Sequence, residues 1–202
     1  MYGIVLAGGS SSRFGEDKLL YEINGTPMIL HVIDRLRKSK SIDEVYVIAS
    51  RNNIDTLRRL GIDNVVEDDL LIGPIGGVLI ALRDFGNVFV VACDMPLLNP
   101  ELVEYITCIY SKYRDKYLAY IPAWLNGYLE PLHGIYVKSI TYFIEVSIKQ
   151  GNYSLCNMIR SLGERIYRII LDYLPFSYRV SVFNVNTKED LRKVKDLLHK
   201  YS

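Results

Sequence analysis

The chain has 202 residues, half of them hydrophobic, which predicts one domain with a sizeable buried core. Its 24 basic and 23 acidic residues leave a formal net charge of +1, which argues against a general nucleic-acid binder, because such proteins carry a basic excess. Three cysteines without CxxC spacing or a Cys/His cluster argue against a disulfide framework and against a zinc site.

Membrane insertion and export are not expected from the hydrophobic pattern. No stretch approaches the roughly 18 apolar residues of a transmembrane helix. The apolar run at residues 4–7 is too short for the hydrophobic region of a signal peptide. We therefore expect a cytoplasmic protein that does not contact a membrane.

In the first half of the chain, strand patterns alternate with helix patterns. Strands are expected at the short apolar or β-branched runs, residues 2–6, 20–23, 44–49, 64–67 and 88–93. Helices are expected at the periodic segments, residues 27–36, 54–60 and 75–85. Ahead of the first helix, an Asn24-Gly25 turn is followed by Thr26 as the expected N-cap and Pro27 as the expected first helical residue.

The second half is less regular. Helices are expected at residues 100–113, 140–149 and 155–162, and strands at residues 117–122, 130–137, 165–171 and 180–185. Thr187 to Asp190 fits a capping box that opens a last helix. Strand–helix alternation predicts a three-layer, Rossmann-like α/β fold, with helices on both faces of a mostly parallel sheet. We see no linker, so residues 1–202 should form one domain, with a nucleotide half at about 1–100 and an acceptor half at about 101–202.

A glycine-rich segment at residues 6–18, LAGGSSSRFGEDK, follows the first predicted strand. Its glycines allow backbone N–H groups to approach an anion closely, and its three serines add hydroxyl donors. Arg13 offers a planar guanidinium and Lys18 a mobile ammonium. The segment is neither a GxGxxG fingerprint nor a P-loop, and the alternative is an ordinary surface loop. Its donors favour a polyphosphate-binding site.

Asp94 follows the most apolar of the predicted strands, in the sequence Cys93-Asp94-Met95-Pro96. Ligands of parallel α/β sheets bind beyond the carboxyl ends of the strands. Mg²⁺ takes one or two protein carboxylates and completes its octahedron with water and phosphate oxygens. Asp94 is therefore a candidate Mg²⁺ ligand, and a structural turn aspartate is the alternative.

Residues 6–18 resemble the LAGGxSxRxGxDK signature of the molybdenum cofactor nucleotidyltransferases, the MobA-type enzymes within the wider NTP-transferase family. Phe14 stands where that family usually has Met. Asp94 matches the family's DxPxL metal motif, and residues 73–77, GPIGG, are similar to its GPLxG segment, which lies against the base. Residues 183–191 look like its FxNINTPEDL motif, with Lys188 in place of the proline.

The resemblance implies a nucleotide-diphospho-sugar transferase-like fold and a Mg²⁺-dependent guanylyltransferase. Such an enzyme moves GMP from GTP to the phosphate of molybdenum-molybdopterin, giving molybdopterin guanine dinucleotide and pyrophosphate. The resemblance further implies transient contacts with other proteins of that pathway. The residues implied in nucleotide binding are Leu6, Ala7, Gly8, Gly9, Ser10, Arg13, Lys18, Asp68, Gly73, Pro74, Gly76 and Asp94.

Catalytic roles are implied for Arg13, Lys18 and Asp94, and the metal role falls on Asp94. Asn184 and Asn186 are the expected acceptor-binding residues, because alternation along a strand would direct both amides to one face. Asparagines that merely cap a strand end are the alternative. A lone histidine is more often structural than catalytic, so His133 is assigned no role.

Other functions stay open at this stage. Within the transferases, CTP could replace GTP, and a sugar phosphate or cobinamide phosphate could replace the pterin acceptor. A nucleotide-binding regulatory module without turnover is the alternative outside the enzymes. The absent GxGxxG fingerprint disfavours a nicotinamide-dependent oxidoreductase.

Overall fold

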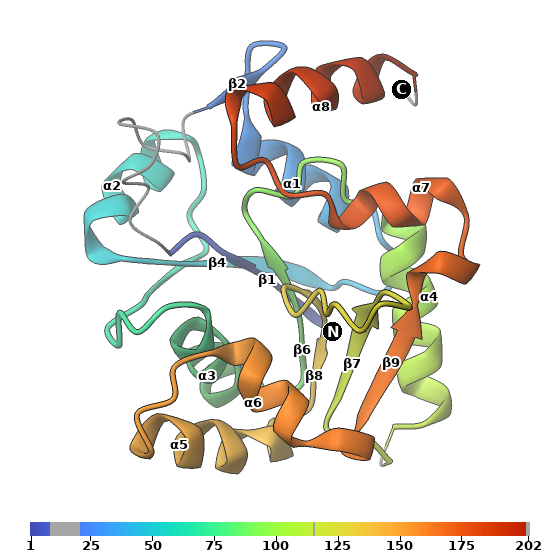
Figure 1. Ribbon diagram of the computed structural model, residues 1–202. Coiled ribbons are helices and arrows are strands. Elements are labelled where there is room, and N and C mark those ends of the chain that lie inside the picture. Colours follow the sequence, from blue (N-terminus) through green and yellow to red (C-terminus); the bar gives the residue numbers. More distant parts are fainter. Residues whose placement is uncertain (9–20, 115, 201–202) are drawn as a thin grey trace.

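A seven-stranded sheet forms the centre of the computed structural model, which describes residues 1–8, 21–114 and 116–200 (Figure 1). The strands lie in the order β5-β4-β1-β6-β8-β7-β9. Their bounds are β1 Tyr2–Leu6, β4 Glu44–Ala49, β5 Val65–Glu67, β6 Val88–Ala92, β7 Ala119–Ala123, β8 His133–Tyr136 and β9 Ile166–Ile170. A separate two-stranded hairpin joins β2 (Glu22–Ile23) to β3 (Thr26–Pro27).

Helices connect these strands along the chain. The α-helices are α1 Met28–Arg37, α2 Arg51–Arg59, α3 Pro74–Phe85, α4 Pro100–Lys112, α5 Thr141–Lys149, α6 Leu155–Ser161, α7 Phe176–Arg179 and α8 Lys188–Lys200. Short 3₁₀ helices are η2 Lys138–Ile140, η3 Gly163–Arg165, η4 Leu171–Tyr173 and η5 Val180–Val182. Within the described ranges, no helix combines the length and the apolar character needed to cross a membrane.

The sheet is mostly parallel, as predicted. β1 is parallel to both β4 and β6, and β7 is parallel to β9. β8 is antiparallel to both of its neighbours, β6 and β7. Gly134 of β8 lies so close to β7 that an added Cβ would stand 2.5 Å from the carbonyl oxygen of Tyr120. Since no side chain fits there without moving the backbone, this position requires glycine.

Alternate residues of the central strands supply two separate cores. Val5 of β1 and Phe89 of β6 belong to the cluster that α1 and α4 complete. Ile4 and Val90 belong to the opposite cluster, which contains residues of α3, α5 and α6. Helices therefore cover both faces of the sheet, and the predicted three-layer arrangement is confirmed (Figure 1).

A third, smaller cluster joins the last helix to residues near the first. Val194 and Leu198 of α8 are buried against Ile23 of the hairpin and Met28 of α1. Figure 1 shows α8 lying beside β2. The capping box predicted at its start is present in part, because the backbone N–H of Asp190 donates to Thr187 Oγ1 at 3.1 Å.

The predicted start of the first helix was wrong. Asn24 and Gly25 both have positive φ, 53° and 78°, and form the tight turn of the hairpin. Thr26 consequently pairs with Ile23 in β3 instead of capping a helix, and Pro27 is extended rather than helical. Residues 26 and 27 pair with β2 in the hairpin, so they are not part of the helix. As a result, α1 begins only at Met28.

The strand predicted at residues 180–185 was also wrong. Val180–Val182 forms the 3₁₀ helix η5, and the residues after it belong to no regular element. The N–H of Phe183 donates to the carbonyl of Val180 at 3.1 Å, and the N–H of Val185 donates to the carbonyl of Asp94 at 2.9 Å. Local turn bonds and one bond to the Asp94 turn replace a strand ladder, so the segment does not join the sheet.

Candidate functional site

The carboxyl ends of β1, β4, β5 and β6 meet at one edge of the sheet. Backbone bonds continue there beyond the strands, from Asp68 N–H to the carbonyl of Ala49 at 2.8 Å and from Cys93 N–H to the carbonyl of Leu6 at 3.1 Å. Gly8 lies beside Asp68, because a Cβ on Gly8 would stand 3.4 Å from Asp68 Oδ2. The parallel topology thus brings the end of the first strand together with a carboxylate that lies 60 residues later in the sequence.

Asp68 is buried, with 7% of its surface exposed. Its Oδ1 accepts hydrogen bonds from the backbone N–H groups of Leu70 and Leu71, at 3.2 and 3.0 Å. This is an Asx-type turn, in which a carboxylate oxygen takes the place of a backbone acceptor. Asp68 therefore shapes the loop before α3 with one oxygen and presents the other toward Gly8.

Residues 73–77 open helix α3. Gly73 has a φ of 82° and is exposed, and Pro74 follows it in the first turn. Gly76 and Gly77 are buried, and a Cβ on Gly77 would lie 3.0 Å from Leu6 Cδ2. Close packing of α3 on β1 therefore explains Gly77, while Gly73 and Pro74 stay accessible at the helix N-terminus, where N–H groups and the helix dipole favour an anion.

The glycine-rich segment is described only at its start. Leu6 and Ala7 are buried in the two opposite cores, and the N–H of Ala7 donates to the carbonyl of Ile48 at 2.8 Å, so both residues serve packing and strand pairing. Gly8 is exposed. The predicted binding residues Gly9, Ser10, Arg13 and Lys18 lie outside the described residues, and their roles stay predictions.

Asp94 lies in the turn after β6 and is half-buried. Its carbonyl accepts the N–H of Val185, so the segment with the two predicted acceptor residues lies against this turn. The half-buried Asn184 donates from Nδ2 to the carbonyl of Val182 at 3.2 Å, whereas Asn186 is exposed. The alternation argument for two amides on one face does not hold, because this segment is not a strand; its proximity to Asp94 is a separate observation.

The donor set near Asp94 suits one kind of cation. The described residues contain no group of three or more His, Cys, Asp or Glu side chains that could hold a metal. A site based on Asp94 would take substrate oxygens and water among its ligands. Mg²⁺ is commonly held in this way when it accompanies a nucleotide.

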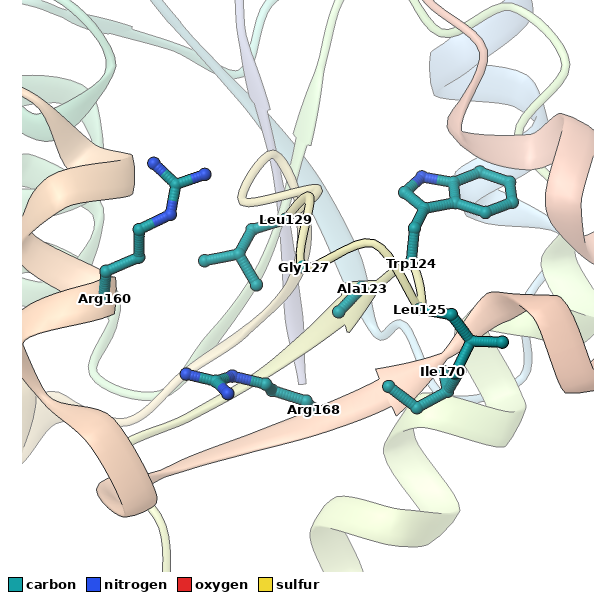
Figure 2. A pocket seen from close by; sticks show the side chains of 8 residues that line it. All are labelled: Ala123, Trp124, Leu125, Gly127, Leu129, Arg160, Arg168 and Ile170. Atoms are coloured by element: carbon teal, nitrogen blue, oxygen red, sulfur yellow. The ribbon is translucent and has the colours of Figure 1, made fainter.

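A pocket of about 340 Å³ lies beyond the end of β7, and sequence reasoning did not find it (Figure 2). Arg160 of α6 and Arg168 of β9 contribute two cations to a lining that is otherwise apolar. Their sequence spacing carries no known motif. Only the folding of α6 and β9 around β7 brings them together, so they form a candidate anion site that the topology creates.

A second pocket, of about 410 Å³, shares Trp124 with the first one. Trp124 and Glu130 line it, and Trp124 Nε1 donates to Glu130 Oε1 at 2.8 Å. Glu130 is 8% exposed, and burial raises the pKa of its carboxyl while the hydrogen bond from Trp124 opposes that rise. Asn184 belongs to the same lining, so this pocket reaches the segment that contacts Asp94.

His133 is completely buried and stays neutral. Its Nε2 lies 3.3 Å from Ser181 Oγ, which also accepts the N–H of Asn99. Burial lowers the pKa of His133 to about 3. This arrangement fastens η5 to β8 and the Asp94 turn region, a structural role that agrees with assigning His133 no catalytic part.

Acidification should destabilise the protein through His133. Its pKa is lowered when folded, so below about pH 6.5 the unfolded chain binds a proton that the folded chain does not. The free energy of unfolding should then fall by up to about 1.4 kcal/mol per pH unit as the pH drops from about 6.5 toward 3. Urea unfolding at about pH 7.5 and 5.5 measures this. Between these two pH values, the free energy of unfolding of His133→Asn should fall by about 1.4 kcal/mol less than that of the wild type. An equal fall in both proteins would contradict the prediction. His31→Asn is the control.

Strand ends that carry glycines and a carboxylate at one edge of a mostly parallel sheet define an α/β nucleotide-binding protein. The family model for the MobA-like NTP transferase domain matches residues 3–166. The chain therefore belongs to this family and is a nucleotidyltransferase.

Relatives are similar over nearly the whole chain. A protein of Thermococcus gammatolerans is 50% identical over 194 residues, covering 96% of this chain and 98% of its own, and is named a probable molybdenum cofactor guanylyltransferase. A protein of Thermococcus sibiricus with the same name is 45% identical, covering 98% and 99%. The solved structure of molybdopterin-guanine dinucleotide biosynthesis protein A from Archaeoglobus fulgidus superposes with a TM-score of 0.82, at 24% identity, over 99% of this chain and 100% of that one. The expected fold class is confirmed.

Proposed function

We propose that this nucleotidyltransferase moves GMP from GTP to the phosphate of molybdenum-molybdopterin. The observation that carries the proposal is the near full-length similarity, at 50% and 45% identity, to the two Thermococcus proteins named probable molybdenum cofactor guanylyltransferases. We further propose that residues 1–202 act as one cytoplasmic domain, with the nucleotide bound by about the first 100 residues and the acceptor by the rest. Transient contacts with other proteins of the pathway belong to the same proposal.

GTP is proposed to bind at the edge where β1 and β5 end. Leu6, Ala7 and Gly8 would line the site there, together with the predicted donors Gly9, Ser10, Arg13 and Lys18. The base would lie against Gly73, Pro74 and Gly76 near Asp68. Exposure of Gly73 and Pro74 and the proximity of Gly8 to Asp68 support this assignment.

The reaction needs positioning and charge stabilisation more than covalent help from the protein. An oxygen of the acceptor phosphate would attack the α-phosphorus of GTP, and the bond to pyrophosphate would break. Arg13 and Lys18 would hold the triphosphate and offset the charge that develops on departing pyrophosphate. Asp94 would hold Mg²⁺, which when bound neutralises phosphate oxygens. The acceptor phosphate is already anionic near neutral pH, so no general base is required.

The acceptor is proposed to bind on the other side of Asp94, next to Asn184 and Asn186. The hydrogen bond from Val185 to the carbonyl of Asp94 supports this, because it holds these residues against the turn. The pocket with Arg160 and Arg168 adds positive charge to the acceptor half, which suits an anionic substrate.

Competition among nucleotides tests the donor and the acceptor together. With equal GTP, CTP and ATP, Mg²⁺ and a molybdopterin-type acceptor, we expect a guanylylated product to dominate by roughly 30-fold or more. The reason is that a site built for the N–H donors and the carbonyl of guanine leaves buried groups unpaired against another base, at about 1–3 kcal/mol each. Mass spectrometry identifies the products.

Other outcomes of this competition would contradict specific parts of the proposal. An excess of cytidylyl product would overturn the choice of GTP. Transfer to a sugar phosphate or to cobinamide phosphate, but not to the pterin, would overturn the acceptor while preserving the reaction class. Binding of GTP without release of pyrophosphate would indicate a regulatory module.

A further inference from the structure

We propose that the pocket beside Trp124 binds the pterin ring of the acceptor, with aromatic side chains against the ring faces and the carboxylate of Glu130 on the ring edge. This pterin pocket is the 410 Å³ pocket described above. The inference rests on the proposed function, because it names the group by which the acceptor is recognised. Its defining residues are Trp124, Glu130, Phe176, Arg179, Phe183 and Asn184.

The topology gives the pterin pocket its place on the acceptor side. Its lining comes from the segment between β7 and β8 and from the chain after β9. The proposed GTP-binding residues come from the ends of β1 and β5, on the opposite side of β6 in the sheet order. Asp94 follows β6 between them. Since Asn184 lines the pocket and its neighbour Val185 bonds to Asp94, a ligand held here can extend its phosphate toward that turn.

The lining suits a flat heterocycle. A volume of about 410 Å³ falls within the usual range for small-molecule sites. Trp124, Phe176 and Phe183 supply aromatic surface, and the side chain of Phe176 is 49% exposed. In Figure 2 the indole of Trp124 stands apart from Arg160 and Arg168, so it does not serve the neighbouring arginine pocket alone.

Glu130 supplies the polar selectivity. Its Oε1 accepts from Trp124 Nε1 at 2.8 Å, which fixes the plane of the carboxylate. A carboxylate has about four acceptor positions, so this bond leaves room for two parallel N–H donors from a ligand. A pterin presents such a pair, a ring N–H and an amino group side by side, in the manner of a guanidinium fork. Burial raises the pKa of Glu130 and the hydrogen bond from Trp124 opposes that rise, so further N–H donors from a ligand would favour the carboxylate form.

Arg179 lines the same pocket as Glu130 and carries hydrogen-bond donors. Its guanidinium lies 5.6 Å from the ring of Phe176, and its buried Nε has no hydrogen-bond partner among the described residues. A pterin carries a carbonyl oxygen next to the N–H donors of its edge. The combination of Glu130 and Arg179 therefore matches a ligand edge that carries two adjacent donors and then an acceptor.

Guanine has a similar edge, so the experiment must separate it from a pterin. Trp124 is the only tryptophan of the chain, and its fluorescence reports on this pocket directly. We expect 6-hydroxymethylpterin to quench that fluorescence saturably, and GMP at the same concentration not to. The pterin's own fluorescence anisotropy should also rise on binding, and Trp124→Phe identifies the part of the signal that comes from the indole.

Two variants test the assigned contacts. Glu130→Gln should weaken pterin binding about tenfold or more, because the amide loses the charge and one acceptor position. Phe176→Ala should weaken it about fivefold or more through lost stacking, and its half-exposed position makes it the safer variant for folding. Glu164→Gln and Tyr173→Ala, at exposed positions outside the pocket, are the matched controls.

Pterin binding that is unchanged in both Glu130→Gln and Phe176→Ala would overturn the inference. Quenching by GMP in competition with the pterin would overturn it in favour of a guanine site. Transfer of GMP to the acceptor by a protein that binds no pterin at Trp124 would refute the inference alone. Pterin binding without any transfer of GMP would instead refute the proposed function.

Discussion

Asp94→Asn should reduce kcat about a hundredfold or more and shift the Mg²⁺ requirement to higher concentration. The amide keeps the shape of the side chain and removes the charge that would hold the cation. Metal assistance at a phosphoryl centre contributes several kcal/mol, and about 2.7 kcal/mol corresponds to a hundredfold in rate. The Val185 bond uses the backbone carbonyl of Asp94, so the fold of the turn should survive the substitution. Steady-state rates across a Mg²⁺ titration measure both effects.

Asp69, which follows Asp68 in the sequence, supplies the control. Asp69 is exposed, and Asp69→Asn should leave the Mg²⁺ dependence unaltered. If Asp94→Asn retained the wild-type dependence, the ligand would lie elsewhere, and Asp68 would be tested next. Asp68→Asn has a second effect to separate, because Oδ1 of Asp68 supports the turn at Leu70 and Leu71. A thermal melt distinguishes loss of that turn from loss of metal.

Lys18→Ala should lower kcat/KM for GTP about ten- to a hundredfold. Removal of a hydrogen bond to a charged group costs about 1.5–3 kcal/mol, which converts to that range. Loss of a contact that strengthens as pyrophosphate departs should appear in kcat, whereas loss of a ground-state contact should appear in KM. Lys149→Ala removes an exposed lysine at the end of α5 and should change neither parameter. Wild-type kinetics in Lys18→Ala would exclude the lysine as a triphosphate ligand.

The sequence predicted the architecture because its signals are local. Residues 44–49 were expected as a strand and form β4 with those bounds, since the apolar run after Glu44 suits a strand covered on both faces. The two errors, at Thr26-Pro27 and at residues 180–185, share one cause. In both places the local pattern was adequate, but a backbone partner elsewhere, Tyr21 for Met28 and Asp94 for Val185, decided the conformation.

Part of the candidate site could be predicted from local sequence signals, and part could not. Asp94, Asp68 and Gly73 could be proposed from sequence because each follows a strand or precedes a helix in a recognisable motif. The two pockets of the acceptor half could not, because their walls combine Trp124, Glu130, Arg160 and Arg168 from elements that only the topology brings together. A buried glutamate two residues after an exposed tyrosine carries no periodic signal that marks it as a ligand-binding group.

The antiparallel strand β8 is the link between the two parallel parts of the sheet. β7 comes earlier in the chain, yet it joins the sheet only through β8, which pairs with β6 on one side and β7 on the other. The strands β7 and β9 should therefore assemble late in folding, and their amide protons should exchange with solvent together, as one cooperative unit, before those of β1 and β6. Any side chain at Gly134 would push β8 away from Tyr120 of β7, so the pairing between these two strands should be the first part of the sheet to be lost.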